Sequence, residues 1–334
     1  MKLPEVGSSG QERLGYAKVL IVGMGGLGCP AAQYLTAAGI GTLGLMDHDL
    51  VNLSNLHRQI LYTESDVGKP KVEVAKKALQ KLNSDVSIIS IPERLDENNA
   101  PSLFEKYDLI IDGSDNFQTK YLINDAAVLT NKSWIYASIY KYQGQLSVFN
   151  YEDGPTYRCL FPKTTNQNVS CEEVGVIGVL PGVLGTLQAT EAIKMILNTG
   201  NILSGKLKII DLLTNQDQLI RLQRNEDEIE KVKVRGLKPE IIECELASIE
   251  KLYLDVREPY EEPRPKDSNV LSIPMNQLEK RHDEIPKDRQ VHVVCQHGIR
   301  SKNAIEYLQE NHGFTNLVNV EDGIQSILKE ESSS

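Results

Sequence analysis

The stretch KVLIVGMGGLGCPAAQYL, residues 18–35, decides the fold of this chain. Its opening segment, Lys18–Val22, is an apolar run that ends at a glycine, which predicts a buried parallel strand. Residues Gly23–Gly28 match the pattern G-x-G-x-x-G, and Cys29–Ala38 has the apolar spacing of a helix. Glycines let a backbone approach a phosphate closely, and a helix N-terminus favours an anion. The stretch therefore predicts a strand, a phosphate-binding turn and a helix.

The remainder of this part of the chain alternates between strand and helix patterns. The expected strands are 42–46, 86–91, 109–112, 145–149 and 206–211, and the expected helices are 71–82 and 185–197. This alternation predicts an α/β fold, a Rossmann-like and mostly parallel sheet with helices on both faces.

A change in composition predicts a second domain. Residues 224–235 are almost all charged or polar, and Gly236 and Pro239 follow, so we expect a solvated linker or polar edge there. Beyond it, strands at 251–256, 290–295 and 317–320 and a helix at 301–311 predict a small α/β domain. The expected division is a first domain at 1–232, a linker at 233–240 and a second domain at 241–334.

The bulk composition narrows the class of function. The net charge of −10 disfavours general nucleic-acid binding. No apolar run approaches the ~20 residues that a membrane span needs, and the N-terminus has no signal-peptide pattern. The cysteines, at 29, 159, 171, 244 and 295, are odd in number and too scattered for a disulfide framework. We therefore predict a cytoplasmic protein without nucleic-acid or membrane partners.

Polar residues after the second expected strand discriminate between nucleotides. Asp47 ends that strand 19 residues after Gly28, where a carboxylate can accept hydrogen bonds from ribose hydroxyls. Up to this point a nicotinamide dinucleotide fits as well as ATP. Arg58 offers a planar fork for phosphate oxygens, Lys71 begins a helix, and Asp115 follows a strand as a carboxylate for Mg²⁺. Cationic groups together with a metal-binding carboxylate favour ATP·Mg²⁺.

The candidate nucleotide-binding residues lie in segments that follow expected strands or begin a helix. They are Gly23, Gly25, Gly26, Gly28, Asp47, Asp49, Ser54, Asn55, Arg58, Gln59, Lys71, Asp115 and Asn116. Because ligands of open α/β sheets bind outside the carboxyl ends of the strands, we expect these residues to surround one site.

Five segments together resemble the family that adenylates sulfur-carrier proteins in molybdopterin and thiamine biosynthesis, relatives of ubiquitin-activating enzymes. The segments are GMGGLGCPAAQYL, LMDHDLVNLSNLHRQ, VGKPK, DGSDN and SCEEVGVIGVLPGVLGTLQATEAIK, and the resemblance covers roughly residues 3–225. It implies that the C-terminal Gly-Gly carboxylate of a ubiquitin-like sulfur carrier attacks ATP·Mg²⁺, giving an acyl-adenylate and pyrophosphate. It also implies a homodimer.

The resemblance implies roles for individual residues. It assigns phosphate contact to Gly26, the ribose to Asp47, the triphosphate to Asn55 and Arg58, the α-phosphate to Lys71 and Mg²⁺ to Asp115. Adenylation of this kind needs positioning and electrostatic stabilisation, and it needs no protein nucleophile.

Two cysteines are candidates for acyl or sulfur chemistry. Cys171 precedes a glycine-rich stretch. In some relatives the matching cysteine receives the acyl group or forms an acyl disulfide, and in others it is dispensable. Cys295 follows an apolar strand in the loop CQHGIRS, and a helix begins at Ser301. The loop N–H groups, the helix N-terminus and Arg300 are expected to lower the pKa of the thiol and to stabilise a persulfide anion.

Residues 240–330 resemble a rhodanese, a sulfurtransferase domain. The Cys295 loop carries this resemblance together with the segments DVRE, residues 255–258, and DGI, residues 322–324. A phosphatase loop is one residue longer between its cysteine and arginine, so the shorter loop favours sulfur over phosphate. The two domains together predict a carboxylate activated by ATP and then converted to a thiocarboxylate with sulfur that a persulfide donor supplies to Cys295.

The chain departs from the family's pattern at two places. Many relatives hold a structural zinc with two Cys-x-x-Cys pairs, but here the first pair reads Thr156-Tyr-Arg-Cys159 and residues 224–232 contain no cysteine. We predict no zinc and expect Cys159 to be a small hydrophobe. Relatives also begin with an Arg-Tyr-x-Arg-Gln-type motif whose arginine reaches the partner subunit's ATP. Arg13 is not at the matching position, and we expect a truncated start.

Three alternatives stay open at this point. The first is the same chemistry on the thiamine carrier in place of the favoured molybdopterin-synthase type. The second is a Rossmann NAD-dependent oxidoreductase. The third is a scaffold that binds the carrier without turnover.

Overall fold

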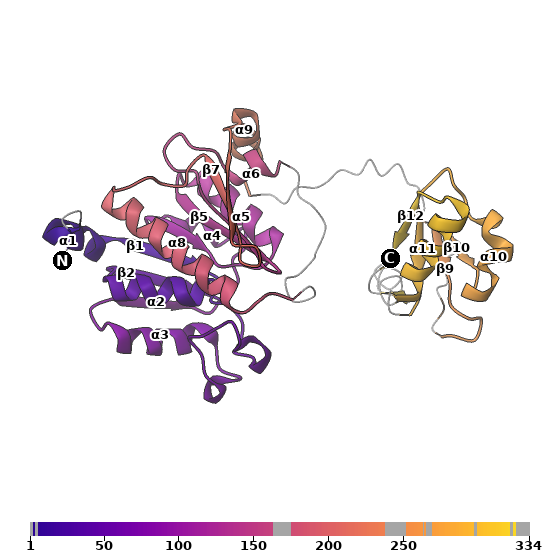
Figure 1. Ribbon diagram of the computed structural model, residues 1–334, viewed down its shortest axis with the longest axis horizontal. Helices are drawn as coiled ribbons and strands as arrows, with labels where there is room; N and C mark the ends of the chain where they lie inside the picture. Colours follow the sequence, from indigo (N-terminus) through magenta and orange to yellow (C-terminus); the bar gives the residue numbers. More distant parts are fainter. Residues whose placement is uncertain are drawn as a thin grey trace. The chain divides into compact units, whose positions relative to one another are not determined.

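The computed structural model divides the chain into two compact units, Met1–Glu240 and Ile241–Ser334 (Figure 1). It describes residues 3, 6–162, 175–237, 252–262, 264, 269–296, 299–320 and 323–324. Each unit has its own sheet and its own hydrophobic core. In these ranges, no helix has both the length and the apolar character needed to cross a membrane.

The first unit is built on an eight-stranded sheet with the order β3-β2-β1-β4-β5-β6-β7-β8. Its first five strands pair in parallel, and the last three continue the sheet in antiparallel fashion. The strands are β1 Lys18–Val22, β2 Thr42–Met46, β3 Ser87–Ile91, β4 Leu109–Asp112, β5 Ser133–Tyr140, β6 Gln143–Phe149, β7 Lys206–Asp211 and β8 Gln216–Arg221.

The register of the parallel strands aligns their carboxyl ends. Val22 pairs with Met46 on one side and with Asp112 on the other, and Met46 pairs with Ile91. The segments that follow these four residues therefore leave the sheet side by side at one edge. This edge is where the sequence predicts the nucleotide site.

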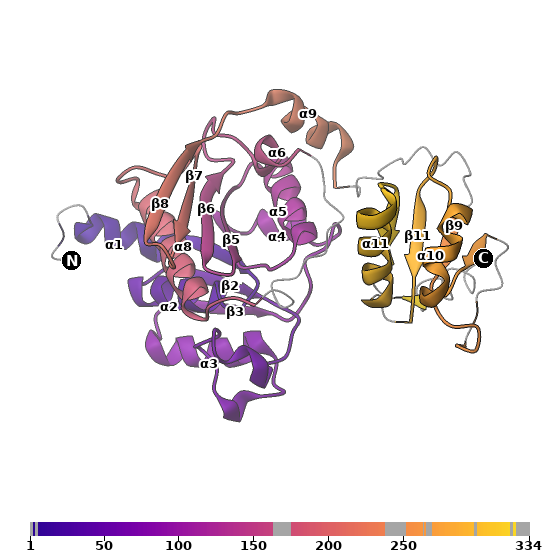
Figure 2. The ribbon, with the colours of Figure 1, turned by 45° about the vertical axis from the view of Figure 1, so that its right-hand side comes forward.

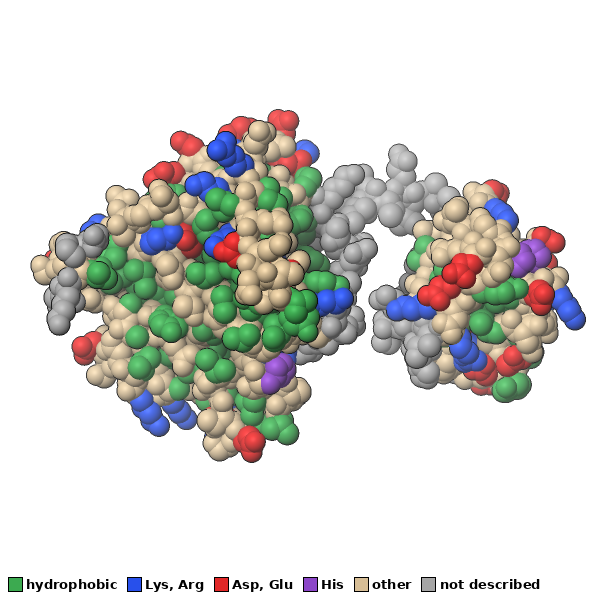
Figure 3. All heavy atoms as spheres, viewed as in Figure 1, with side chains coloured by type: hydrophobic (Ala, Val, Ile, Leu, Met, Phe, Trp, Pro, Cys, Tyr) green, Lys and Arg blue, Asp and Glu red, His purple; other side chains and the backbone are tan. Residues whose placement is uncertain are grey.

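Helices cover both faces of the sheet (Figures 1 and 2). One face carries α1 Gly7–Tyr16, α2 Gly28–Ala38, α3 Lys71–Leu82 and α8 Val179–Leu197, and the other carries α4 Ala100–Phe104, α5 Phe117–Leu129 and α6 Tyr157–Leu160. Successive residues of a strand point to opposite faces, so Ile21 joins the core under α2 and α8 while Leu20 joins the core under α4 and α5. The predicted α/β fold is confirmed. Apolar side chains gather over part of this unit's surface in Figure 3, and Val179 at the start of α8 is 58% exposed.

Two boundaries differ from those expected. Helix α8 begins at Val179, not at residue 185. Pro181 lies in its first turn, where a helix leaves its N–H groups without internal partners and a missing N–H costs nothing. Strand β5 escaped the sequence pattern because its apolar residues continue through Trp134–Ala137 without alternation, which does not separate a strand from a helix.

The polar segment that we expected to be a linker or edge forms helix α9, Glu226–Arg235. The Asn225 side chain accepts hydrogen bonds from the N–H groups of Asp227 and Glu228, which caps the helix. Ile229 and Val232 are buried against Val128 of α5. One cap and two apolar side chains at helical spacing are enough to dock a helix whose other residues are polar. Residues 233–235, expected to start the linker, therefore belong to α9.

The second unit contains a four-stranded parallel sheet with the order β10-β9-β11-β12. Its elements are β9 Leu252–Asp255, β10 Val270–Ser272, α10 Leu278–Arg281, β11 Val291–Val294, α11 Ile299–His312 and β12 Leu317–Asn319, with single 3₁₀ turns at Met275–Gln277 and His282–Glu284. Val291 and Val293 of β11 share a core with Ala304 and Leu308 of α11. Cys295 lies at the end of this core, directly after β11.

Candidate functional site

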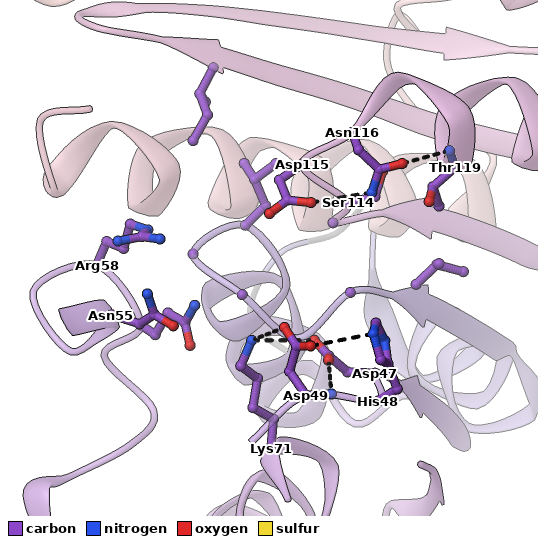
Figure 4. A pocket seen from close by; sticks show the side chains of 18 of the residues that line it. Asp47, His48, Asp49, Asn55, Arg58, Lys71, Ser114, Asp115, Asn116 and Thr119 are labelled. Atoms are coloured by element: carbon purple, nitrogen blue, oxygen red, sulfur yellow. Dashed lines mark hydrogen bonds and ion pairs between the residues drawn. The ribbon is translucent and has the colours of Figure 1, made fainter. Parts of the chain in front are cut away.

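A cavity of about 720 Å³ opens at the carboxyl edge of the first unit's parallel strands (Figure 4). This volume falls in the range of about 300–1,000 Å³ that small-molecule sites occupy. Of the thirteen candidate nucleotide-binding residues, all but Gly28 line it. The sheet edge has therefore brought together residues that lie between positions 23 and 116 of the sequence.

The glycine-rich turn forms the floor of the cavity. Gly23 has φ +96°, and a Cβ there would lie 2.6 Å from the carbonyl oxygen of Gly113, which belongs to the segment after β4. A Cβ on Gly28 would clash with the carbonyl oxygen of Gly23. Gly28 thus closes the turn against the start of α2 and does not face the cavity. Only glycine fits these two positions, because the turn and its neighbour touch backbone to backbone.

A buried thiol lies beneath this turn. The Cys29 Sγ donates to the carbonyl oxygen of Met24 over 3.5 Å, and the Tyr62 hydroxyl donates to the same oxygen over 2.8 Å. Burial raises the pKa of Cys29 to about 12. The thiol stays neutral at physiological pH, so Cys29 supports the turn and is not a nucleophile.

The carboxylate of Asp47 ties the second strand to the glycine-rich turn. It accepts hydrogen bonds from the N–H of Met24 at 2.7 Å and from the N–H of Asp49 at 2.8 Å. Each carboxylate oxygen keeps a second lone pair that can accept a hydroxyl. Asp47 is therefore held rigidly at the rim, in a position that suits a ribose.

Lys71 is buried at the start of α3 and points into the cavity. Its Nζ lies 2.8 Å from Asp49 Oδ2 and 3.9 Å from Asp47 Oδ2. Burial alone would raise the pKa of Asp49, but the hydrogen bond and the charge of Lys71 outweigh burial and hold that pKa below its ordinary value. Two carboxylates thus lie beside the ammonium ion at the cavity.

Asn55 and Arg58 occupy another wall of the cavity, on and after the 3₁₀ turn Leu53–Asn55 (Figure 4). The Asn52 side chain caps this turn by accepting from the N–H and the hydroxyl of Ser54. Arg58 Nη1 lies 3.5 Å from His57 Nε2. A second short turn, Glu64–Asp66, leads the chain to Lys71.

Asp115 and Asn116 approach from the segment between β4 and α5. The Asn116 side chain accepts from the N–H of Thr119 at 2.8 Å and donates to Asp115 Oδ1 at 3.3 Å. Asn116, which we predicted to contact the nucleotide, is therefore also the cap of α5. Figure 4 shows the Asp115 side chain on this wall, across the cavity from Lys71.

Two more polar features bear on ligand fit. Gln59 lines the cavity, and its buried Oε1 has no hydrogen-bond partner among the described residues. Asp47, His48 and Asp49 place potential metal-ligand atoms within 4.8 Å of one another. Both carboxylates already bind N–H groups or Lys71, which leaves Asp115 as the better-placed ligand for Mg²⁺. The cationic and acidic side chains of the cavity together fit ATP with one metal ion.

Some residues that line the nucleotide cavity were not among the candidates predicted from the sequence. Glu93, Arg94 and Leu95 follow β3 at the same edge, and Ser138 and Ile139 lie on β5. Residues 93–95 follow an expected strand, and the other strands that end at this edge also contribute residues to the cavity. Their position could therefore have predicted them as cavity residues. Lys120, on α5, also lines the cavity.

In the second unit, Cys295 is buried at the end of β11. Its Sγ lies 3.4 Å from the Ser301 hydroxyl, and its carbonyl oxygen accepts from the N–H of Ile324 at 2.9 Å. Arg257, which is fully buried, binds both oxygens of Asp255 at 2.9 Å and the Gln296 side chain at 3.1 Å. The chain just after Cys295 is thus anchored from β9. His297 and Gly298 of the same loop lie outside the described residues.

Arg300 has an ion-pair partner in the second unit. Its guanidinium forms two hydrogen bonds with the Glu261 carboxylate, at 2.7 and 2.6 Å. The Arg300 hydrogen bond in particular lowers the pKa of Glu261 to about 2. We expected Arg300 to add positive potential at Cys295, and this ion pair with Glu261 offsets part of that potential. No local pattern points to this partner, because Glu261 lies 39 positions away.

Cys171 and Cys159, for which the sequence also predicted roles, have different outcomes. Cys171 lies outside the described residues. Cys159 is partly exposed, and its Sγ accepts hydrogen bonds from the N–H groups of Thr156 at 3.3 Å and Asn225 at 3.2 Å. Cys159 packs against the cluster of Val128, Ile229 and Val232, as expected of a small hydrophobe, and its hydrogen bonds also connect α6 to the start of α9.

Comparison with known proteins places the chain in a family. Residues 1–231 match the model described as the ThiF family, and residues 242–330 match the rhodanese-like domain. The chain belongs to the ThiF family. It is an adenylyltransferase with a sulfurtransferase domain, and adenylyl transfer implies the use of ATP. This assignment decides against the NAD-dependent oxidoreductase.

Individual relatives cover most of the chain. A sulfur carrier protein adenylyltransferase of Thermus thermophilus is 50% identical over 67% of this chain and 86% of its own length. A probable adenylyltransferase/sulfurtransferase MoeZ of Mycobacterium tuberculosis is 35% identical over 98% of this chain and 91% of its own. Among solved structures, Escherichia coli MccB with ATP has a TM-score of 0.58 and 27% identity, covering 64% of this chain and 66% of that one.

Proposed function

We propose that this enzyme uses ATP and Mg²⁺ to adenylate the C-terminal Gly-Gly carboxylate of a ubiquitin-like sulfur-carrier protein, and that Cys295 then supplies sulfur for a thiocarboxylate. The observation that carries the proposal is the meeting of Asp47, Arg58, Lys71 and Asp115 around one cavity. The same chain holds a rhodanese-like unit in which Cys295 follows a core strand.

The charges around the cavity suit an attack on the α-phosphate. In this proposal Asp47 accepts the ribose hydroxyls, and Asn55 and Arg58 bind the triphosphate. Lys71 stabilises the negative charge that develops as pyrophosphate leaves. Its ammonium ion is preorganised by Asp49 at 2.8 Å, so little reorganisation is needed during the reaction.

Asp115 is the proposed ligand of Mg²⁺. Magnesium in such sites is held by one or two carboxylates together with substrate phosphates, and it neutralises charge on the phosphate oxygens. The Asn116 amide, which contacts Asp115 Oδ1 at 3.3 Å and caps α5, orients the carboxylate. Gly26 lies on the opposite side of the proposed phosphates, on the glycine-rich turn.

Sulfur transfer follows by displacement. The Cys295 thiolate attacks the outer sulfur of a persulfide donor and releases the donor's thiolate. The terminal sulfur of the resulting persulfide attacks the acyl carbon, and AMP leaves with the bonding electrons. A thiol, either Cys171 or a small-molecule thiol, then attacks the Cys295 sulfur, which releases the carrier thiocarboxylate. A second thiol reduces the disulfide left on Cys295.

We favour a carrier of the molybdopterin-synthase type. A relative from Porphyra purpurea, 35% identical over 97% of this chain and 90% of its own length, is described as a probable molybdopterin-synthase adenylyltransferase. The thiamine carrier is the alternative, because both carriers end in Gly-Gly. Comparing kcat/KM for the two carriers distinguishes these substrates.

We further propose a cytoplasmic homodimer that binds no zinc. The homodimer is consistent with exposed apolar side chains on the segment after β2, where Leu53 is 61% and Ile60 is 63% exposed. At the place of the first cysteine pair, Cys159 has Thr156 and Asn225 as its hydrogen-bond partners. Sedimentation equilibrium tests the dimer, and elemental analysis of the purified protein tests the absence of zinc.

Carrier-dependent exchange of labelled pyrophosphate into ATP tests adenylation. We expect exchange with a Gly-Gly carrier and a loss of about 100-fold or more in Arg58→Ala, because Arg58 acts on the charged triphosphate. Lys77→Ala is the matched control, since Lys77 is an exposed cation on α3 outside the cavity. A lack of exchange with every Gly-Gly carrier would leave the non-catalytic scaffold as the better account.

A further inference from the structure

The sheet of the first unit splits between β4 and β5 at the edge of the nucleotide cavity. Backbone pairing of these strands ends at Ile111 and Ile135, whereas the antiparallel pairing of β5 with β6 runs on to Tyr140. The carbonyl oxygen of Ile135 lies at the last β4–β5 pair, and those of Asp112 and Ala137 lie beyond it. Buried carbonyl groups need hydrogen-bond donors from elsewhere.

Two buried side chains supply these donors, one from each face of the sheet. Gln188 of α8 donates from Nε2 to the carbonyl oxygens of Asp112 at 2.7 Å and Ile135 at 3.2 Å. From the opposite face, Lys120 of α5 donates to the carbonyl oxygen of Ala137 at 2.9 Å. Together they close the split with polar contacts where strand pairing is lost.

Lys120 also binds the segment that carries Asp115. Its Nζ lies 2.6 Å from Asp112 Oδ2 and 3.0 Å from the carbonyl oxygen of Ser114. Asp112 in turn accepts from the N–H of Ser114 at 2.9 Å and from its hydroxyl at 2.5 Å. The Lys120 ammonium ion thus spans β5, the end of β4 and the loop 113–116.

The position of this lysine is unfavourable except for these contacts. Lys120 is 3% exposed, and it lies in the first turns of α5, where the helix dipole disfavours a cation. The fully buried Asp112 carboxylate compensates the charge, and the ammonium lies 5.3 Å from the centre of the Tyr136 ring. An ammonium group has three N–H donors, and these three contacts use all of them.

We propose that Lys120 is a positioning residue of the nucleotide site: its ammonium ion closes the β4–β5 split and holds the loop 113–116, with Asp115, against the glycine-rich turn. The loop meets that turn where Gly113 N–H donates to the Val22 carbonyl oxygen at 2.7 Å. Lys120 acts through Asp112 and Ser114 and does not itself contact the nucleotide, since its donors are occupied.

Hydrogen exchange of the nucleotide-free full chain tests this directly. In Lys120→Met, which keeps the side-chain length but removes the charge and the donors, we expect amides of residues 113–116 to exchange about tenfold faster or more, because a charged hydrogen-bond set is lost. Amides of β1 and β2 should stay near wild type. Lys120→Arg keeps the charge but has a planar donor set, so its loop exchange should lie between the two. Lys77→Met controls for the loss of a lysine elsewhere.

A second measurement connects the loop to its ligand. The positioning of Asp115 rests on the proposed function, so the Mg²⁺ concentration for half-maximal pyrophosphate exchange should rise several-fold in Lys120→Met, with KM for the carrier unchanged. A general loss of folding would lower the active fraction without moving the Mg²⁺ requirement.

The outcomes separate the two proposals. Wild-type loop exchange in a folded Lys120→Met overturns the role of Lys120. If Lys120→Met does not fold, Lys120→Arg is the deciding variant. Hydrogen exchange and a Mg²⁺ dependence equal to those of the wild type in Lys120→Arg would overturn the proposed role of Lys120. If the wild type shows no carrier-dependent activity, the proposed function fails, while hydrogen exchange of the nucleotide-free protein still decides the role of Lys120.

Discussion

The ammonium nitrogen of Lys71 lies 2.8 Å from the Asp49 carboxylate, although the two residues are 22 positions apart. The pair forms because α3 begins where the segment after β2 returns to the sheet edge: the N–H of Lys71 also donates to the Asp49 carbonyl oxygen at 3.0 Å. Backbone and side chain together fix the lysine, so its charge faces the cavity before any ligand arrives.

Removing this charge should affect catalysis more than stability. We expect Lys71→Ala to lower kcat for carrier-dependent pyrophosphate exchange by about 100-fold or more, as for other groups that stabilise charge in a transition state. Lys77→Ala, on the same helix but exposed, should stay near wild type. Initial rates for the two variants check this, and equal rates would contradict the role of Lys71.

Cys295 should be needed for sulfur transfer alone. We expect Cys295→Ala to retain pyrophosphate exchange and to form no thiocarboxylate from thiosulfate or a persulfide donor, because the sulfane sulfur has no other proposed carrier. Cys159→Ala is the matched control, since that thiol bonds to backbone N–H groups of Thr156 and Asn225. Mass spectrometry of the carrier C-terminus measures the product. Thiocarboxylate formation by Cys295→Ala would show a redundant sulfur source.

The Glu261–Arg300 pair should stabilise the second unit in a pH-dependent way. The pKa of Glu261 falls from 4.5 to about 2, chiefly through its hydrogen bond to Arg300. A depressed carboxyl pKa stabilises the fold above about pH 4.5, and this contribution disappears as the pH falls towards 2. Glu261→Gln should therefore lower the thermal midpoint at pH 7 and have a smaller effect at pH 3.

The size of that effect is limited by solvent. Arg300 is 40% exposed, so screening keeps the contribution of the pair to about 1 kcal/mol or less. Calorimetry of Glu261→Gln against Glu262→Gln, a change at an exposed neighbour, gives the comparison. A difference between them that stayed constant from pH 7 to pH 3 would rule out the linkage.

Helix α9 should depend on two apolar side chains. Val232 is fully buried, while Val234 on the same helix is 83% exposed. We expect Val232→Ala to lower the free energy of unfolding of the first unit by roughly 1–2 kcal/mol, from lost burial and a small cavity. Val234→Ala should change it by less than about 0.5 kcal/mol. Urea unfolding measures both, and equal effects would show that α9 is not docked through Val232.

The sequence predicted the sheet and most of the nucleotide site because both depend on local patterns. The run Lys18–Val22 and the glycines after it specify a strand and a turn without reference to any distant residue. Parallel strands then impose a common edge, so the sequence alone predicts that Asp47 and Asp115 lie near the turn. The α9 helix was missed because its signal is only Ile229 and Val232 in a polar segment.

Other features needed the folded chain. Glu261 forms an ion pair with Arg300, Lys120 binds the carbonyl oxygen of Ala137 at the β4–β5 split, and Cys159 bonds to the backbone of Asn225. In each case the partner is far away in sequence or is a backbone group whose need for a donor arises only when strand pairing ends. No residue pattern encodes such a need.

By itself, the sequence determined most of the elements, the edge of the sheet where the candidate site lies and many of the chemical groups that meet there. The hydrophobic period, the placement of glycines and the residue types are local properties of the chain, and they are the same in the unfolded and the folded protein. Only the tertiary structure decided which charged side chains form ion pairs with one another. That depends on the distances between groups such as Lys71 and Asp49 or Arg300 and Glu261, and those distances exist only once the elements have packed.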